Sequence, residues 1–223
     1  MARIKINGAI VSNDDAWIYD MFDIEHACPK CIEQQINDAN GEDLDIDINS
    51  GGGDVFSGSA IYSAIRAYKG NVNIHVTGIA ASAASVIACA AHSDISPTAQ
   101  LMVHCVSAYV DGNHNDLAKE SADLQKADRA IAAAYTAKSG MSEKDALDLM
   151  ENETWIPADD AVGYGLIDEI ASNLNGACGG GDGSKKKKNA EPERMAASVS
   201  GLLPPSVIDK MQNRKQQLID YFA

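Results

Sequence analysis

Ser82 is the side chain whose context most directly suggests chemistry. It lies in TGIAASAASVIACAAHSD, residues 77–94, four residues after a glycine that ends a predicted strand. At the start of a helix, backbone N–H groups lack intrahelical partners and favour a negative oxygen. Such donors could stabilise the oxyanion formed when a serine attacks a carbonyl, by about 3 kcal/mol each. The same segment also fits a simpler interpretation, in which Ser82 and Ser85 are small residues that let a buried helix pack closely.

A glycine run and a histidine are the other candidates. Gly51, Gly52 and Gly53 follow a predicted strand in INSGGGDVFSG, and their N–H groups can approach an anion because no side chain shields them. Their spacing matches neither the dinucleotide-binding pattern nor the phosphate-binding loop. His104 lies in the short segment LMVHC, residues 101–105, and could serve Ser82 as a general base. A lone strand histidine is more often a hydrogen-bonded structural residue, so its role stays open at this point.

The elements that would position these residues alternate between strands and helices. Period-two alternation predicts strands, and apolar residues at near-helical spacing predict helices. We expect strands at residues 3–10, 43–49, 72–78, 101–105 and 166–170, with a further short one around Trp155. We expect helices at 16–39, 54–68 and 115–138, one capped by Ser142 and one opened near Pro157. Strands joined by crossover helices indicate the α/β class.

The composition changes sharply after Ser172. Residues 173–200 combine a glycine cluster with four consecutive lysines, which predicts a flexible, solvated linker. Residues 201–223 carry apolar side chains at helix-like spacing after two prolines, which predicts a short amphipathic tail. We therefore expect one folded domain at 1–172, then a linker and a helical tail.

Charge and hydropathy argue against several classes of protein. The chain has 32 acidic and 18 basic residues, a formal net charge of −14, so binding to nucleic acid has no general electrostatic support. Its first residues alternate in polarity, unlike a signal peptide, and its longest apolar run, residues 79–91, is too short for a bilayer. We expect a soluble, cytoplasmic protein with no membrane contact.

The cysteines do not predict a disulfide framework. There are five of them in a chain without an export signal, so we expect free thiols. His26, Cys28 and Cys31 have the spacing of half a zinc site, but no second pair of ligands at matching spacing follows in the sequence. We therefore expect neither a metal nor a cofactor.

Together these features resemble the Clp-type serine peptidase family. The family elements INS-x-GG, G-x-AAS, M-[IV]-H and A-x-x-A-x-x-YG-[LF]-[IV]-D stand here as INSGGG, GIAAS, MVH and ADDAVGYGLID, within residues 3–172. The resemblance implies the crotonase-like βα superhelix, with repeated β-β-α units. It also implies a homo-oligomeric ring, in which helix 115–138 contacts other subunits. Simple packing within the domain would explain that helix as well.

The resemblance also implies roles for individual residues. Ser82 would be the nucleophile and His104 the general base of an acyl-enzyme mechanism. The family's oxyanion donors fall on the backbone N–H groups of Gly53 and Ala83. No metal or other cofactor takes part in the implied reaction.

The third catalytic residue departs from the family pattern. Relatives usually have aspartate two residues before an aromatic residue, and this chain has Glu153 before Trp155. Glutamate can hold the same imidazole tautomer, but its extra methylene changes its reach. The neighbouring acids Asp148 and Glu151 are alternatives for the role.

Further departures resemble the phage and prophage branch of the family. Gly51 replaces the proline of housekeeping members, and the first predicted strand begins near Arg3, which leaves little of the segment that contacts an unfoldase ATPase. The branch implies an ATP-independent head maturation protease that cleaves capsid or scaffolding protein, in the bacterial cytoplasm or inside a procapsid, without an unfoldase. Two alternatives remain open, a catalytically silent assembly protein and a crotonase-type acyl-CoA enzyme.

Overall fold

A mixed sheet forms the centre of the computed structural model, which describes residues 1–172 and 203–222. Within these residues the sheet has eight strands, ordered β2-β1-β3-β4-β5-β8, with β6 beside β4 and β7 beside β6. The strands are β1 (Ala2–Ile10), β2 (His26–Ala27), β3 (Leu44–Gly53), β4 (Val72–Ala81), β5 (His92–Ile95), β6 (Gln100–Val103), β7 (Thr154–Pro157) and β8 (Glu169–Ile170). Neighbours pair in parallel except β6 and β7, which are antiparallel.

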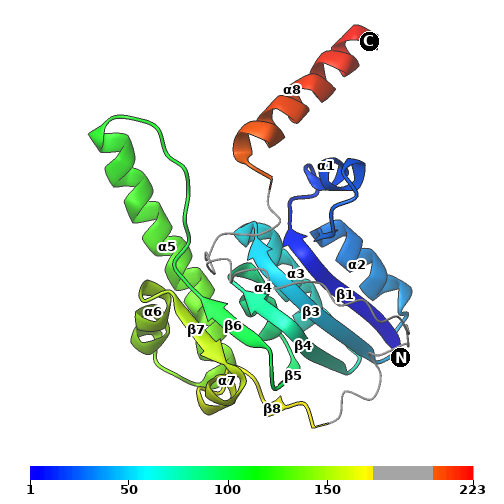
Figure 1. Cartoon of the computed structure of the whole chain (residues 1–223), viewed down its shortest axis with the longest axis vertical. Coiled ribbons are helices and arrows are strands. Elements are labelled where there is room, and N and C mark those ends of the chain that lie inside the picture. Colours follow the sequence, from blue (N-terminus) through cyan, green and yellow to red (C-terminus); the bar gives the residue numbers. More distant parts are fainter. Residues whose placement is uncertain (173–202, 223) are drawn as a thin grey trace, which may run out of the picture.

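Helices α2, α3 and α4 lie together on one face of this sheet, and α5 extends away from it (Figure 1). The helices are α1 (Ala16–Met21), α2 (Pro29–Asp38), α3 (Val55–Ala67), α4 (Ala83–Ala88), α5 (His114–Ser139), α6 (Glu143–Glu151), α7 (Ala158–Gly163) and α8 (Pro205–Phe222). None of the helices in the described part of the chain is both long and apolar enough to cross a membrane.

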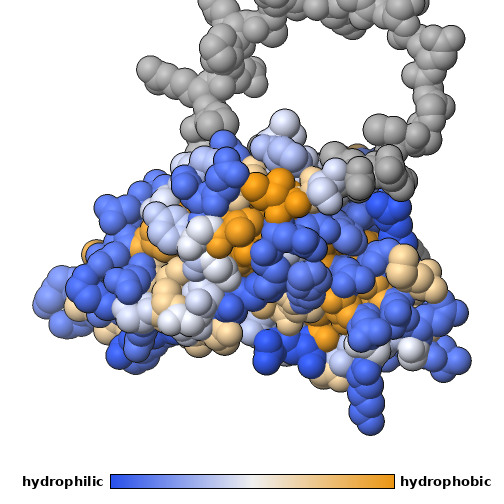
Figure 2. Space-filling model, turned by 90° about the horizontal axis from the view of Figure 1, so that it is seen from below, coloured by the Kyte–Doolittle hydropathy of each residue, from blue (hydrophilic) through white to orange (hydrophobic). Residues whose placement is uncertain are grey.

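Alternation along the strands divides the sheet into an apolar and a polar face. The apolar face is buried against the helices and includes Ile4, Ile6, Leu44, Ile46, Ile48, Ile74 and Val76. Each such side chain contributes about 1.5–3 kcal/mol when it is fully buried. The opposite face carries charged pairs, such as Arg3 with Asp47 at 2.7 Å and His75 with Asp94 at 2.7 Å. Seen from below, most of the visible surface is hydrophilic, with smaller apolar areas between polar side chains (Figure 2).

The expected helix at residues 16–39 is wrong in its middle. The structure ends α1 at Met21, turns through Asp23 with φ 54°, and forms β2 before α2 begins at Pro29. Proline disfavours helical backbone in the residue before it and cannot donate an N–H, so it stands at the start of α2. The sequence pattern also missed β5. The strand expected at residues 43–49 is longer in the structure, where β3 continues through Gly53.

The expectation of free thiols is wrong for one pair of cysteines. Cys28 caps α2 and Cys31 lies in its first turn, so their Cα atoms are 5.3 Å apart, and the two form a disulfide. Cys89 and Cys105 are free within residues 1–172. The same described residues contain no cluster of histidine, cysteine or carboxylate side chains that could hold a metal ion.

The C-terminal helix begins beside α1 (Figure 1). The backbone N–H of Leu203 donates to the Tyr19 hydroxyl at 2.9 Å, and Ile208 and Met211 pack on a small apolar cluster that includes Ile18. The helix expected in the tail is therefore present as α8. The expected linker at residues 173–200 lies outside the described residues, so the division of the chain into domain, linker and tail stays a prediction.

Candidate active site

Two neighbouring strands bring Ser82 and His104 together. Strands β4 and β6 pair in parallel with Ala81 opposite Met102, so the residues that follow them emerge at the same edge of the sheet. There the Nε2 atom of His104 lies 2.8 Å from Oγ of Ser82. A serine–histidine pair at this distance can transfer a proton from the hydroxyl to the imidazole.

The backbone of Ser82 has an unusual conformation. Its φ is 53° and its ψ −125°, at the sharp turn from β4 into α4. A residue other than glycine in such a region is strained by about 1–3 kcal/mol and persists only where surrounding contacts hold it. Here the Ser82 N–H donates to the carbonyl of Met102 at 2.8 Å, and its own carbonyl accepts from the N–H of Ser85 at 3.0 Å. A strained serine at a strand-to-helix turn is the geometry that exposes Oγ of a nucleophile.

The glycine turn packs directly against this serine. Gly52 has φ +91°, and a Cβ built on it would lie 2.7 Å from Cβ of Ser82 and 3.0 Å from the backbone nitrogen of Ala83. Ser50 holds the turn, since its hydroxyl accepts from the Gly52 N–H at 3.0 Å and donates to the carbonyl of Gly8 at 2.6 Å. Because Ala83 is the first residue of α4, its N–H has no partner within the helix. The turn and the helix start therefore meet beside Cβ of Ser82, the atom that carries its hydroxyl.

Glu153 lies at the same end of the sheet as His104. Thr154 is paired with Val103 across β7 and β6, so Glu153 and His104 are the next residues along the two strands. Glu153 is exposed and has φ 50°. No hydrogen bond joins it to His104 among the described residues. Of the two alternative acids, Asp148 forms an ion pair with Lys144 on the surface of α6.

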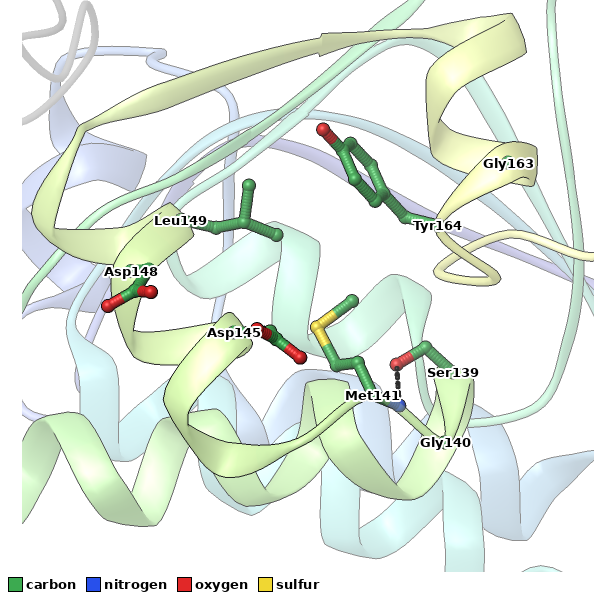
Figure 3. Close-up of a pocket in the computed structure, with 8 residues that line it drawn as sticks. All are labelled: Ser139, Gly140, Met141, Asp145, Asp148, Leu149, Gly163 and Tyr164. Atoms are coloured by element: carbon green, nitrogen blue, oxygen red, sulfur yellow. Dashed lines mark hydrogen bonds between the residues drawn. The ribbon is translucent and has the colours of Figure 1, made fainter.

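A separate open pocket of about 560 Å³ lies between the end of α5, α6 and α7 (Figure 3). Met141, Leu149 and Tyr164 lie around it, with Asp145 and Asp148 on its α6 side. Neither Ser82 nor His104 lines this pocket. Both carboxylates have partners, because Asp145 accepts from the hydroxyl of Ser142 and Asp148 pairs with Lys144. The pocket is therefore distinct from the serine–histidine site.

Helix α5 makes two buried polar contacts behind the site that the sequence patterns did not reveal. Asp128 accepts a hydrogen bond of 2.7 Å from the N–H of Val106, two residues after His104. The hydroxyl of Tyr135 lies 2.8 Å from Oγ of Ser85. These two residues of α5 are seven positions apart and so lie on one face of the helix. The sequence signal that could have revealed these contacts is the pair of polar side chains seven positions apart on an otherwise apolar helical face.

Cys105 follows His104 at the end of β6, and its side chain is half-buried. Burial, followed by the nearby carboxylate of Asp128, raises the pKa of its thiol to about 11. The thiol is therefore protonated at neutral pH. This excludes Cys105 as a competing thiolate nucleophile beside His104.

Comparison with known proteins agrees with this geometry. The family model described as Clp protease matches residues 27–174. The chain is 31% identical over 140 residues to ATP-dependent Clp protease proteolytic subunit 1 of Chlamydia abortus, covering 60% of this chain and 73% of that protein. It is 28% identical over 159 residues to ATP-dependent Clp protease proteolytic subunit 3 of Rhodococcus jostii, covering 67% and 75%.

A solved structure confirms the fold expected from the resemblance. A mutant of ClpP1 from Listeria monocytogenes superposes with a TM-score of 0.64 at 22% identity, covering 78% of this chain and 92% of that one. The family model and the Chlamydia relative show that the similarity holds for the sequence as well as for the fold. It covers most of the domain that carries Ser82 and His104. This chain therefore belongs to the Clp protease family.

Proposed function

We propose that the protein is a serine endopeptidase in which Ser82 is the nucleophile and His104 the general base. The observation that carries the proposal is the 2.8 Å contact between Nε2 of His104 and Oγ of Ser82. The strained backbone of Ser82 supports the proposal, because strained residues are found most often in active sites and ligand-binding sites. Membership of the Clp protease family supports the reaction class.

The proposed reaction follows from these positions. Oγ of Ser82 attacks the peptide carbonyl carbon while its proton passes to Nε2 of His104. The backbone N–H groups of Gly53 and Ala83 stabilise the resulting oxyanion. The C–N bond then breaks as His104 protonates the leaving amine, and water hydrolyses the acyl-enzyme by the same proton transfers in reverse.

We assign Glu153 as the residue that orients the histidine. Because Nε2 of His104 must accept the serine proton, its Nδ1 must carry the other proton. The position of Glu153 beside His104 across β6 and β7 supports it as the acceptor for that Nδ1–H. Glu153→Gln should therefore lower kcat with little change in KM, whereas Glu151→Gln, at the neighbouring acid, should leave both unchanged.

Labelling with a fluorophosphonate probe tests the nucleophile. We expect covalent labelling of the wild type and none of Ser82→Ala, while Ser59→Ala, on the exposed surface of α3, labels normally. His104→Ala should slow labelling by at least about 100-fold. Labelling that is independent of Ser82, or none under any condition of assembly, would refute the peptidase and favour a silent assembly protein.

For the substrate, we propose capsid or scaffolding protein cleaved during phage procapsid assembly, by a homo-oligomeric ring and without ATP. The support lies in sequence features, Gly51 in place of proline and the segment ETW, residues 153–155, at the start of β7. Co-expression with a phage capsid precursor and its scaffolding protein, followed by intact mass, tests the proposal. Cleavage with the wild type, and none with Ser82→Ala, is expected. Intact precursors beside an enzyme that still reacts with the probe would reject this substrate.

A further inference from the structure

We propose that Ser85 and Tyr135 form a hydrogen-bonded bracket that fixes the peptide between Ser82 and Ala83 and thereby aims the Ala83 N–H into the oxyanion site. Both would be positioning residues, since neither touches the reacting atoms. The inference rests on the proposed function, because it concerns how Ser82 reacts. From the sequence, Ser85 was expected only to be a small residue that permits close packing.

The contacts define the direction of every hydrogen bond in the bracket. The hydroxyl of Ser85 lies 2.6 Å from the carbonyl oxygen of Ser82 and 2.8 Å from the hydroxyl of Tyr135. A carbonyl can only accept, so Ser85 donates its single proton to Ser82. The Tyr135 hydroxyl must then donate to Oγ of Ser85. The chain of donors thus runs from α5 through α4 to the nucleophile's own carbonyl.

The bracket is buried, which makes it rigid. Ser85 is 0% exposed and Tyr135 2% exposed, so water does not compete for these hydrogen bonds. Burial also raises the pKa of the Tyr135 hydroxyl, which keeps its proton available to donate. The two residues are 50 positions apart in the chain and meet only because α5 packs behind α4.

Peptide geometry links this carbonyl to the oxyanion site. The peptide bond between Ser82 and Ala83 is trans, so the Ser82 C=O and the Ala83 N–H point in opposite directions. The Ser82 carbonyl is held toward Ser85 by two donors, the hydroxyl and the N–H of that residue. The Ala83 N–H must therefore point away from Ser85. Its nitrogen lies beside the glycine turn, 3.0 Å from where a Cβ of Gly52 would stand.

The alternative is that Ser85 and Tyr135 only fill space. Ser85→Ala and Tyr135→Phe separate the two ideas, since each removes a hydroxyl and preserves most of the packed volume. Thr136→Val is the matched control, because it removes a hydroxyl from the next residue of α5. Within the described residues, that hydroxyl donates to the carbonyl of Ala133 in its own helix. Urea unfolding of each variant would establish that the fold is retained.

Steady-state hydrolysis of a fluorogenic peptide, together with inhibition by a peptide aldehyde, measures the effect. We expect Ser85→Ala to lower kcat by about 10- to 100-fold with KM little changed, since a misaimed donor acts on the transition state. Aldehyde affinity, which reports the tetrahedral adduct, should fall in parallel. Tyr135→Phe should show a smaller loss of the same kind. The double variant should lose no more than Ser85→Ala alone, because the two act through one chain.

Three outcomes would overturn the bracket. The first is an active wild type whose kcat is unchanged in Ser85→Ala. The second is a double variant in which the free-energy losses of the two single variants add. The third is a loss of kcat in Thr136→Val as large as that in Tyr135→Phe. In each of these the proposed peptidase would still stand, because the wild type hydrolyses the peptide. A wild type that neither hydrolyses the peptide nor labels at Ser82 would remove both proposals together.

Discussion

Replacing Gly52 by alanine would place a methyl group against three atoms of the site. The new Cβ would lie 2.6 Å from the carbonyl oxygen of Ala81, 2.7 Å from Cβ of Ser82 and 3.0 Å from the nitrogen of Ala83. Carbon atoms normally approach such neighbours no closer than about 3.5 Å. The turn and the start of α4 would therefore have to separate by up to about 1 Å.

This separation should affect activity more than stability. A shift of about 1 Å in reacting groups lowers rates by about 100-fold. The φ of +91° at Gly52 adds strain, because alanine in this region is disfavoured by about 1–2 kcal/mol. We thus expect Gly52→Ala to react with a fluorophosphonate at least about 100 times more slowly and to unfold at lower urea, with a loss of about 1–3 kcal/mol.

The neighbouring glycine provides the control. A Cβ on Gly51 would have no atom within 4 Å, and its φ is not positive, so Gly51→Ala should keep the wild-type labelling rate and stability. Rates are followed by the mass of labelled protein over time, and stability by urea unfolding. Wild-type labelling in Gly52→Ala, or equal losses in both variants, would refute this view of the glycine turn.

Two further predictions concern titrating groups outside the reaction. Hydrogen bonding to Asp94 raises the pKa of His75, so the folded state favours the protonated imidazole. The resulting stabilisation is complete at a pH below the pKa of about 6.5 that histidine has in the unfolded chain. It is lost as the pH rises through the higher pKa of the folded state. His75→Asn should therefore lose more unfolding free energy near about pH 5.5 than near about pH 9, and equal losses in urea titrations would contradict this. Burial, followed by Asp128, raises the pKa of Cys105 to about 11, so its alkylation by iodoacetamide should be slow at neutral pH and faster in Asp128→Asn. An unchanged pH–rate profile in that variant would show that Asp128 does not act on the thiol.

Local signals in the sequence were enough to single out the candidate residues of the proposed site. A strand, a glycine run and a helix appear in that order before Ser82, and His104 follows a second short apolar segment. The α/β class follows from alternating periodicities, which the backbone imposes wherever one face of an element is buried. The family resemblance then joined these parts into one site, and the structure places Ser82 and His104 2.8 Å apart.

Other features depended on which elements face one another. Periodicity shows that α5 has a buried face but not that Tyr135 on that face meets Ser85, since the partner surface is set by packing. The positive φ of Ser82 is likewise held by neighbours in α4 and β6, because a residue with a side chain disfavours this backbone conformation by itself. Helical periodicity across residues 16–39 concealed the end of α1 at Met21 and the new start of α2 at Pro29, which places Cys28 and Cys31 close enough for a disulfide. Sequence by itself thus determined which residue types lie at the ends of the strands. Tertiary structure decided their distances and orientations, because contacts between elements remote in the chain leave no periodic pattern in either one.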